Sequence, residues 1–139
     1  MNNQLTEVSP DAERTSLVER LYGAIAAGDV DGAVSVLAPD VELHVPGTHQ
    51  LAGEHRGPDA VVAFAAATRA LTDDGEHIEV LDVLEGRDHV AVLAVVRAER
   101  DGRAPLENRT VHVLATSGGR IDAIWLHNFD DVAVNEFWS

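Results

Sequence analysis

Residues 89–129, HVAVLAVVRAERDGRAPLENRTVHVLATSGGRIDAIWLHNF, decide the fold class of this chain. Strand-like apolar patterning runs through 89–99, 104–116 and 120–129, as in β-strands with a buried face. A Gly-Gly dipeptide stands at 118–119, and such dipeptides favour two-residue hairpin turns. The sequence therefore predicts three long antiparallel strands in its C-terminal half.

A further strand is predicted at 76–85, joined to the next by the turn-like residues 86–88. A second turn is predicted at Asp101-Gly102. Residues 90–96 are apolar at every position, as in a central strand covered on both faces. Because helices can cover only one of these faces, we expect a homodimer through the outer face of the sheet.

The first half of the chain has helical spacing. A helix is predicted to begin at Pro10, capped by Ser9, and to end at Gly28. A short second helix is stopped by Pro39, and the alternating residues 41–45 predict a strand. A third helix opens at Pro58 and ends before the Asp73-Asp74-Gly75 turn.

This order predicts an α+β fold: a strongly bent, mostly antiparallel sheet with three helices packed on its concave face. The 139 residues fit one domain, 1–139, in which residues 1–8 are expected to be flexible. Residues 130–139 end in an aromatic pair, Phe137 and Trp138, which we expect to pack on the core or on a neighbouring subunit.

Composition excludes several classes of function. The net charge of −14 disfavours binding to nucleic acids or anionic membranes. With no cysteine and no lysine, the chain can form neither disulfides nor Schiff bases. No apolar run approaches the roughly 18–20 residues of a membrane span, and residues 1–16 lack a signal-peptide pattern. We therefore expect a soluble, cytoplasmic protein.

Three segments carry a resemblance to a known family. They are residues 17–41, LVERLYGAIAAGDVDGAVSVLAPDV, residues 45–62, VPGTHQLAGEHRGPDAVV, and the ending GGRI…W…D-x-x-AVNEFWS. The chain, from about residue 14 onward, resembles the cone-shaped superfamily of nuclear transport factor 2, ketosteroid isomerase and the SnoaL-like polyketide cyclases. The resemblance implies a conical cavity whose mouth is lined by the first helix, the loop after the first strand and the C-terminal segment.

The resemblance also shows where this chain departs from its better-known members. The base of ketosteroid isomerases falls at Val45, their tyrosine at Leu21 beside Tyr22, and their protonated aspartate near Val111. The aspartate of the polyketide cyclases falls near Leu126. Steroid isomerisation by the usual acids is therefore not expected.

The final hairpin predicts which side chains share a face. With a two-residue turn, Ser117 pairs with Arg120, so that His112 lies opposite Trp125 and Thr110 opposite His127. One face then carries Asn108, Thr110, His112, Trp125, His127 and Phe129, and the other Arg109, Val111, Val113, Ile124, Leu126 and Asn128. The imidazoles favour the first face as the cavity wall. The family pattern favours the second face as the cavity wall, which leaves the first face for a dimer interface. A one-residue slip in register would exchange the faces of one strand.

The candidate catalytic residues are His44, Tyr22, His112 and His127. Imidazoles titrate near neutrality and suit acid–base work, and His44 closes the first predicted strand beside the family's base position. A satisfied strand-end residue is the alternative for His44, and half-buried packing is the alternative for Tyr22.

The candidate substrate-binding residues are Phe64, Trp125, Asn128, His55 and Asp130. Asp130 could equally cap a terminal turn, and His55, like His49, could be an ordinary loop residue. A metal site is not expected, because the spacing of the loop histidines matches no ligand motif.

We expect a cofactor-independent enzyme that moves a proton on an apolar molecule bearing a carbonyl or hydroxyl group, as an isomerase, cyclase or lyase, with secondary metabolism as one setting. The alternative is a non-catalytic domain, either one that binds a small ligand in the same cavity or a purely structural dimer module. The expected partners are a small apolar organic molecule and a second copy of the chain, with no nucleic acid and no membrane.

Overall fold

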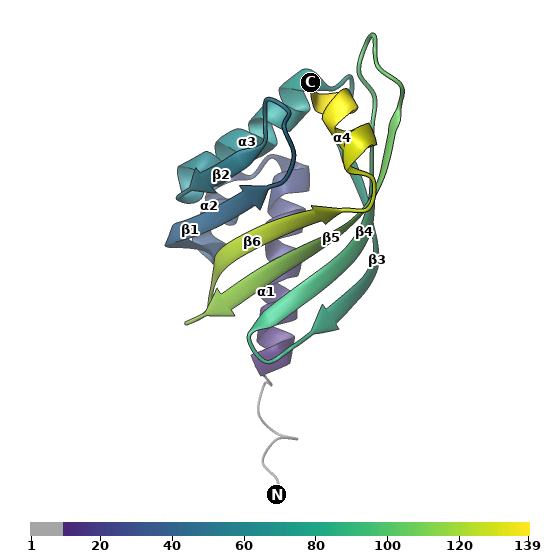
Figure 1. Cartoon of the computed structure of the whole chain (residues 1–139). Helices are drawn as coiled ribbons and strands as arrows, with labels where there is room; N and C mark the ends of the chain where they lie inside the picture. Colours follow the sequence, from purple (N-terminus) through teal and green to yellow (C-terminus); the bar gives the residue numbers. More distant parts are fainter. Residues whose placement is uncertain (1–9) are drawn as a thin grey trace, which may run out of the picture.

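The computed structural model describes residues 10–139 as one sheet of six strands and four helices (Figure 1). The elements are, in chain order, α1 (Pro10–Ala27), α2 (Val30–Val36), β1 (Leu37–Val45), β2 (Gly53–Arg56), α3 (Pro58–Leu71), β3 (His77–Glu85), β4 (His89–Ala98), β5 (Leu106–Ser117), β6 (Arg120–Asn128) and α4 (Asp131–Trp138). The predicted flexibility of residues 1–8 and the predicted cap at Ser9 lie outside the described residues.

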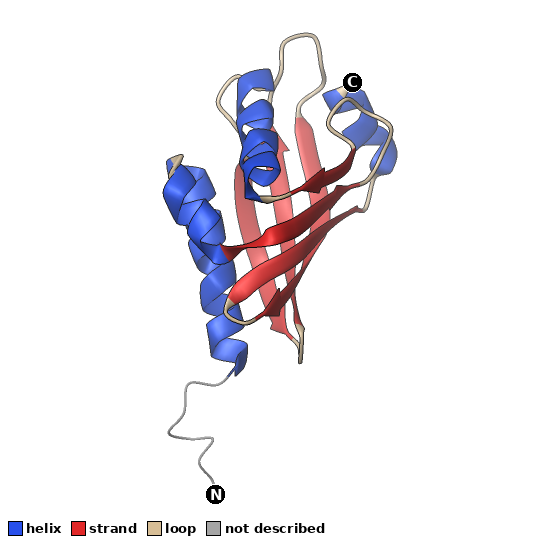
Figure 2. Cartoon of the chain, turned by 90° about the vertical axis from the view of Figure 1, so that its left-hand side faces the viewer, coloured by secondary structure: helices blue, strands red, loops and turns tan. Residues whose placement is uncertain are grey.

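The sheet has the strand order β2-β1-β6-β5-β4-β3. All neighbours run antiparallel except β1 and β6, which are parallel. The sheet curls without closing, and the long helices α1 and α3 lie on its concave side (Figure 2). The predicted fold class, a bent and mostly antiparallel sheet with helices on one face, is confirmed.

Three elements differ from the sequence-based prediction. The chain enters β1 at Leu37, directly after α2 and before Pro39. Pro39 is tolerated because it lies where the register with β6 shifts, between Leu37 and Glu42. The short strand β2 pairs with β1 within a segment predicted to be a loop. The C-terminal residues form a full helix, α4, in place of the expected turn.

The final hairpin, between β5 and β6, differs from its predicted register, and this difference affects the site most. Ser117 does pair with Arg120, but the register shifts by one residue between Ala115 and Thr116. Asp122 is the extra residue, since Ala115 pairs with Ala123 while Thr116 pairs with Ile121. Such a β-bulge turns all later residues of its strand to the opposite face.

The predicted pairings beyond this bulge are therefore wrong by one residue. His112 lies opposite Leu126 instead of Trp125, and Thr110 lies opposite Asn128 instead of His127. Each concave-side residue of β5 consequently faces a residue of β6 that the prediction had placed on the other side.

The core has two parts. The larger one joins α1, α2 and α3 to the concave face, with Leu21, Val41 and Leu114 almost fully buried. The smaller one packs α4 on the ends of β4 and β5. Phe137 and Trp138 are buried there with their rings 4.8 Å apart, edge to face, which confirms their predicted role in packing.

Among residues 10–139, no helix combines the length and apolarity that crossing a membrane requires.

Candidate functional site

A cavity of about 410 Å³ lies between the helices and the concave face of the sheet. Its walls come from α1, α3 and strands β1, β3, β4, β5 and β6, and the segment 46–51 and α4 also contribute. Most of the lining is aliphatic or aromatic. The lining side chains with polar atoms are Tyr22, His49, Thr68, Arg69, Glu76, Asn108, His112, Asn128 and Trp138.

Tyr22 and His112 form a hydrogen-bonded pair across this cavity. The hydroxyl of Tyr22, on α1, lies 2.6 Å from Nδ1 of His112, on β5. Burial lowers the pKa of His112 to about 4, so the ring is neutral at pH 7. Burial also raises the pKa of Tyr22 far above its ordinary value, so its hydroxyl stays protonated.

The two neutral groups can share their protons in two ways. If Tyr22 donates to Nδ1, then Nε2 of His112 carries a proton. If Nδ1 donates to Tyr22, then the Tyr22 hydroxyl is free to donate elsewhere and Nε2 offers a lone pair. Nε2 makes no hydrogen bond to any described residue. In both arrangements the pair retains one unused donor beside the cavity.

His49 contributes a second imidazole to the lining. Its Nδ1 accepts a hydrogen bond of 3.1 Å from the backbone N–H of Leu51, which places the ring proton on Nε2. That Nε2 is buried without a partner among the described residues. Burial lowers the pKa of His49, and the Pro46 carbonyl opposes this in part.

Two asparagines continue the polar side of the sheet. Nδ2 of Asn108 donates to Oδ1 of Asn128 across 2.8 Å, although the two residues are not directly paired. This bond leaves the amino group of Asn128 unused at the cavity and Oδ1 of Asn108 buried without a partner. The pair therefore offers a fixed donor about midway along the sheet wall.

Glu76 lines the cavity just before β3 begins. Burial raises the pKa of its carboxyl to about 7, and the Thr68 hydroxyl opposes the rise. No ion pair is formed by this carboxyl with any described residue. The neighbouring cation of the lining, Arg69, instead donates to the Ile25 carbonyl at the end of α1.

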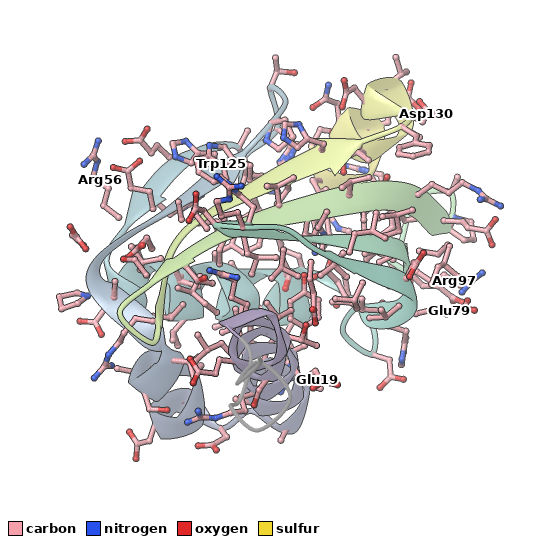
Figure 3. The ribbon with its side chains drawn as sticks, turned by 90° about the horizontal axis from the view of Figure 1, so that it is seen from below. Glu19, Arg56, Glu79, Arg97, Trp125 and Asp130 are labelled. Atoms are coloured by element: carbon pink, nitrogen blue, oxygen red, sulfur yellow. The ribbon has the colours of Figure 1, made fainter. Side chains whose placement is uncertain are left out.

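Four of the residues predicted from sequence meet at the cavity: Tyr22, His112, Phe64 and Asn128. The three others on β1 and β6 do not line it. His44 and His127 lie with Trp125 on the outer face, and Figure 3 shows Trp125 on the side of the sheet away from α1. His44 stacks on Trp125 with the ring planes 6° apart and the centroids separated by 5.6 Å.

His55 and Asp130 also lie outside the lining. Nε2 of His55 is 3.0 Å from the Leu51 carbonyl, and its ring packs on Phe64 behind the cavity wall. The Asp130 carboxylate accepts a hydrogen bond from the Ala133 N–H, so this residue caps α4. The capping alternative for Asp130 is thus confirmed.

The outer face holds the one cluster with metal-ligand geometry among the described residues. Glu42, His44 and Glu54 have ligand atoms within 4.8 Å of one another. Arg56 already pairs with both carboxylates, at 3.2 Å from Glu42 and 2.6 Å from Glu54. This guanidinium already compensates the negative charge of the carboxylates. The absence of a metal remains a prediction.

Glu76 and Arg69 were not predicted as site residues from the sequence, and His49 was predicted to be an ordinary loop residue. Helical spacing could have predicted Arg69, because it lies four residues after Ala65, on the side of α3 where the apolar residues recur. Glu76 lies in a run of polar residues, DDGEH, that looks solvated. Its burial depends on the way α3 and β3 meet, which no local pattern records.

Comparisons with known proteins agree with this architecture. The SnoaL-like domain family matches residues 18–124. Uncharacterized protein Rv0034 of Mycobacterium tuberculosis is 38% identical over 124 residues, covering 88% of this chain and 94% of that protein. The solved structure of Bal32a, from a soil-derived mobile gene cassette, superposes with a TM-score of 0.89 at 26% identity, covering 94% of this chain and all of that one.

A third comparison includes a ligand. RV0760c from Mycobacterium tuberculosis, solved in complex with estradiol-17beta-hemisuccinate, shares the fold with a TM-score of 0.71 at 19% identity, covering 86% of this chain and 95% of that one. Other solved neighbours carry the names NTF2-like and ketosteroid isomerase-like. Since the family match spans most of the chain and Rv0034 is related along nearly its whole length, this chain belongs to the SnoaL-like domain family.

Proposed function

We propose that the protein is a cofactor-independent enzyme that moves a proton on an apolar substrate bearing a carbonyl or hydroxyl group. The observation that carries the proposal is the neutral Tyr22–His112 pair, 2.6 Å apart, in the wall of an otherwise mostly apolar cavity. An apolar cavity with a few convergent polar groups is the usual form of a small-molecule site.

In the proposed step, His112 donates from Nδ1 to Tyr22, and the Tyr22 hydroxyl donates to the substrate oxygen. A C–H bond next to the carbonyl breaks, its proton goes to Nε2 of His112, and its electron pair forms the C=C bond of an enol or enolate. Tyr22 stabilises the negative charge that develops on oxygen. The reverse transfer returns the proton to the same or to another carbon.

The low pKa of His112 suits a shuttle of this kind. A ring with a pKa of about 4 is neutral at pH 7, so Nε2 keeps a lone pair that can accept a proton. Once protonated, it is a strong acid that gives the proton back quickly.

A deuterium-exchange experiment tests the proposal before the natural substrate is known. The protein is incubated in D2O with 2-tetralone and with rigid three-ring and four-ring ketones, and deuterium at the α-carbon is followed by mass spectrometry. We expect exchange above the buffer rate for at least one ketone, and a loss of roughly 100-fold or more in Tyr22→Phe and His112→Gln.

The matched control is His89→Gln, which removes an exposed imidazole from β4. It should exchange at the wild-type rate. Exchange that survives both cavity variants would contradict the assigned roles. Ketones that bind without any exchange would support the alternative function, a domain that only binds its ligand.

A further inference from the structure

The polar groups of the cavity are separated along the sheet. His112 and Asn108 are four residues apart on β5, which corresponds to about 13 Å of strand. Across the sheet, Asn108 pairs with Val96 and Val96 pairs with Ile78. Glu76 precedes Ile78 by two residues and therefore lies still farther from the row that holds His112.

The lining between these ends is mainly apolar. Phe64 and Val80 belong to it, and the hydrogen-bonded amides of Asn108 and Asn128 are intervening polar groups. The cavity is thus elongated, with the Tyr22–His112 pair toward one end and Glu76, Thr68 and Arg69 toward the other.

We infer that Glu76 forms a second subsite, which accepts a hydrogen bond from a hydroxyl group at the far end of an elongated, apolar ligand whose opposite oxygen reaches the Tyr22–His112 pair. The inference rests on the proposed function, because it takes the oxygen at the pair as given. It specifies the substrate class: a rigid, multi-ring molecule with a carbonyl at one end and an alcohol or phenol at the other.

Three features of Glu76 support this role. Its carboxyl lines a largely apolar cavity, where an unpaired polar group is costly, and no described residue forms an ion pair with it. The Thr68 hydroxyl donates to the Ala65 carbonyl at 2.8 Å, and its contact with the Glu76 carboxyl engages one oxygen at most. At least one carboxyl oxygen therefore remains free for a ligand.

The chemistry of the carboxyl selects a hydroxyl over an ammonium group. Because burial raises the pKa of Glu76 to about 7, the group is only partly ionised at neutral pH. A hydroxyl can donate to the ionised form and accept from the protonated form, whereas an ammonium group depends on a full negative charge.

Calorimetric titration with a matched ligand pair tests the inference. Estrone has a ketone at one end and a phenol at the other, and 3-deoxyestrone lacks only the phenol oxygen. We expect wild type to bind estrone about tenfold more tightly than 3-deoxyestrone. Glu76→Leu should bind both with equal affinity, and Glu76→Gln, which retains one acceptor oxygen, should fall between.

Glu79→Gln is the matched control. Glu79 lies three residues farther along the chain, on β3, but it is exposed and pairs with Arg97 at the sheet edge (Figure 3). This variant should keep the wild-type preference. A wild-type ratio near one, or a preference that survives in Glu76→Leu, would overturn the subsite. If wild type binds neither steroid, the substrate class is wrong.

The two proposals fail in different ways. Exchange of ketone α-hydrogens without a Glu76-dependent preference for estrone would remove the subsite and leave the enzyme. A Glu76-dependent preference without exchange of any ketone would retain the subsite in a protein that only binds ligands.

Discussion

The hydroxyl of Tyr22 lies 2.6 Å from Nδ1 of His112, although 90 residues separate them in the chain. This contact joins α1 to β5 and equips the cavity with a donor at the same time. Both groups are neutral at pH 7, and burial shifts the pKa of each further toward the neutral form. The pair therefore costs less desolvation energy than an ion pair would.

Replacing Tyr22 with phenylalanine should destabilise the fold. The variant leaves Nδ1 of His112 without a partner in a buried position, which costs about 1–3 kcal/mol. Urea denaturation followed by far-UV circular dichroism measures this change in the free energy of unfolding. An unchanged midpoint would mean that the hydrogen bond does not form in solution.

His112 should make the protein less stable as the pH falls. Its folded-state pKa is about 4 against an ordinary value of 6.5, so the unfolded state binds the proton first. The stabilising effect of the neutral ring is complete above pH 6.5 and is lost as the pH falls toward 4. The full difference is about 3 kcal/mol.

Glu76 should act in the opposite direction over almost the same range. Its pKa rises from 4.5 unfolded to about 7 folded, so its contribution is complete below pH 4.5 and is lost as the pH rises through 7. In wild type the two contributions nearly cancel. Together, these two groups should therefore change the denaturation midpoint little between pH 4 and 7.5. Relative to wild type, Glu76→Gln should gain stability with rising pH and His112→Gln should lose it; parallel curves would contradict both shifts.

The bulge at Asp122 should be indispensable to the cavity. Deleting Asp122 would restore the regular register and turn Ile124 and Leu126 away from the concave face. We expect this deletion to abolish cooperative thermal unfolding, while Asp122→Ala, which keeps the residue count, unfolds cooperatively. A deletion variant that folds as well as wild type would show that the register is set elsewhere.

The outer face should bind a second copy of the chain. Trp125 stacks on His44 and lies beside the tilted ring of His89, so it presents an aromatic surface there. Aromatic residues are enriched at the centres of interfaces. Light scattering should give the mass of a dimer for wild type and of a monomer for Trp125→Arg. A wild-type monomer would contradict this prediction.

The sequence predicted the fold well because its signals are local. Apolar periodicity, Gly-Gly and Asp-Gly turns, and prolines at helix starts each act within a few residues, and together they specified three helices and four long strands. The family resemblance supplied the way in which these elements enclose a cavity.

The site was predicted less completely because it depends on contacts between distant elements. One extra residue in β6 decided that Asn128 faces the cavity and that Trp125 and His127 do not. His112 lies beside Tyr22 on the concave face of β5, whereas His44 alternates with the buried Leu43 and Val45 and so lies on the outer face of β1. The enclosure of Glu76 and His49 depends on packing, which periodicity cannot detect.

A crystal structure of the protein with a bound multi-ring ketone tests the central claim most directly. The account predicts that the ketone lies in the cavity with its oxygen within about 3.2 Å of the Tyr22 hydroxyl or of Nε2 of His112. A ketone bound in the cavity with its oxygen remote from both atoms, or bound on the outer face beside His44 and Trp125, would contradict it.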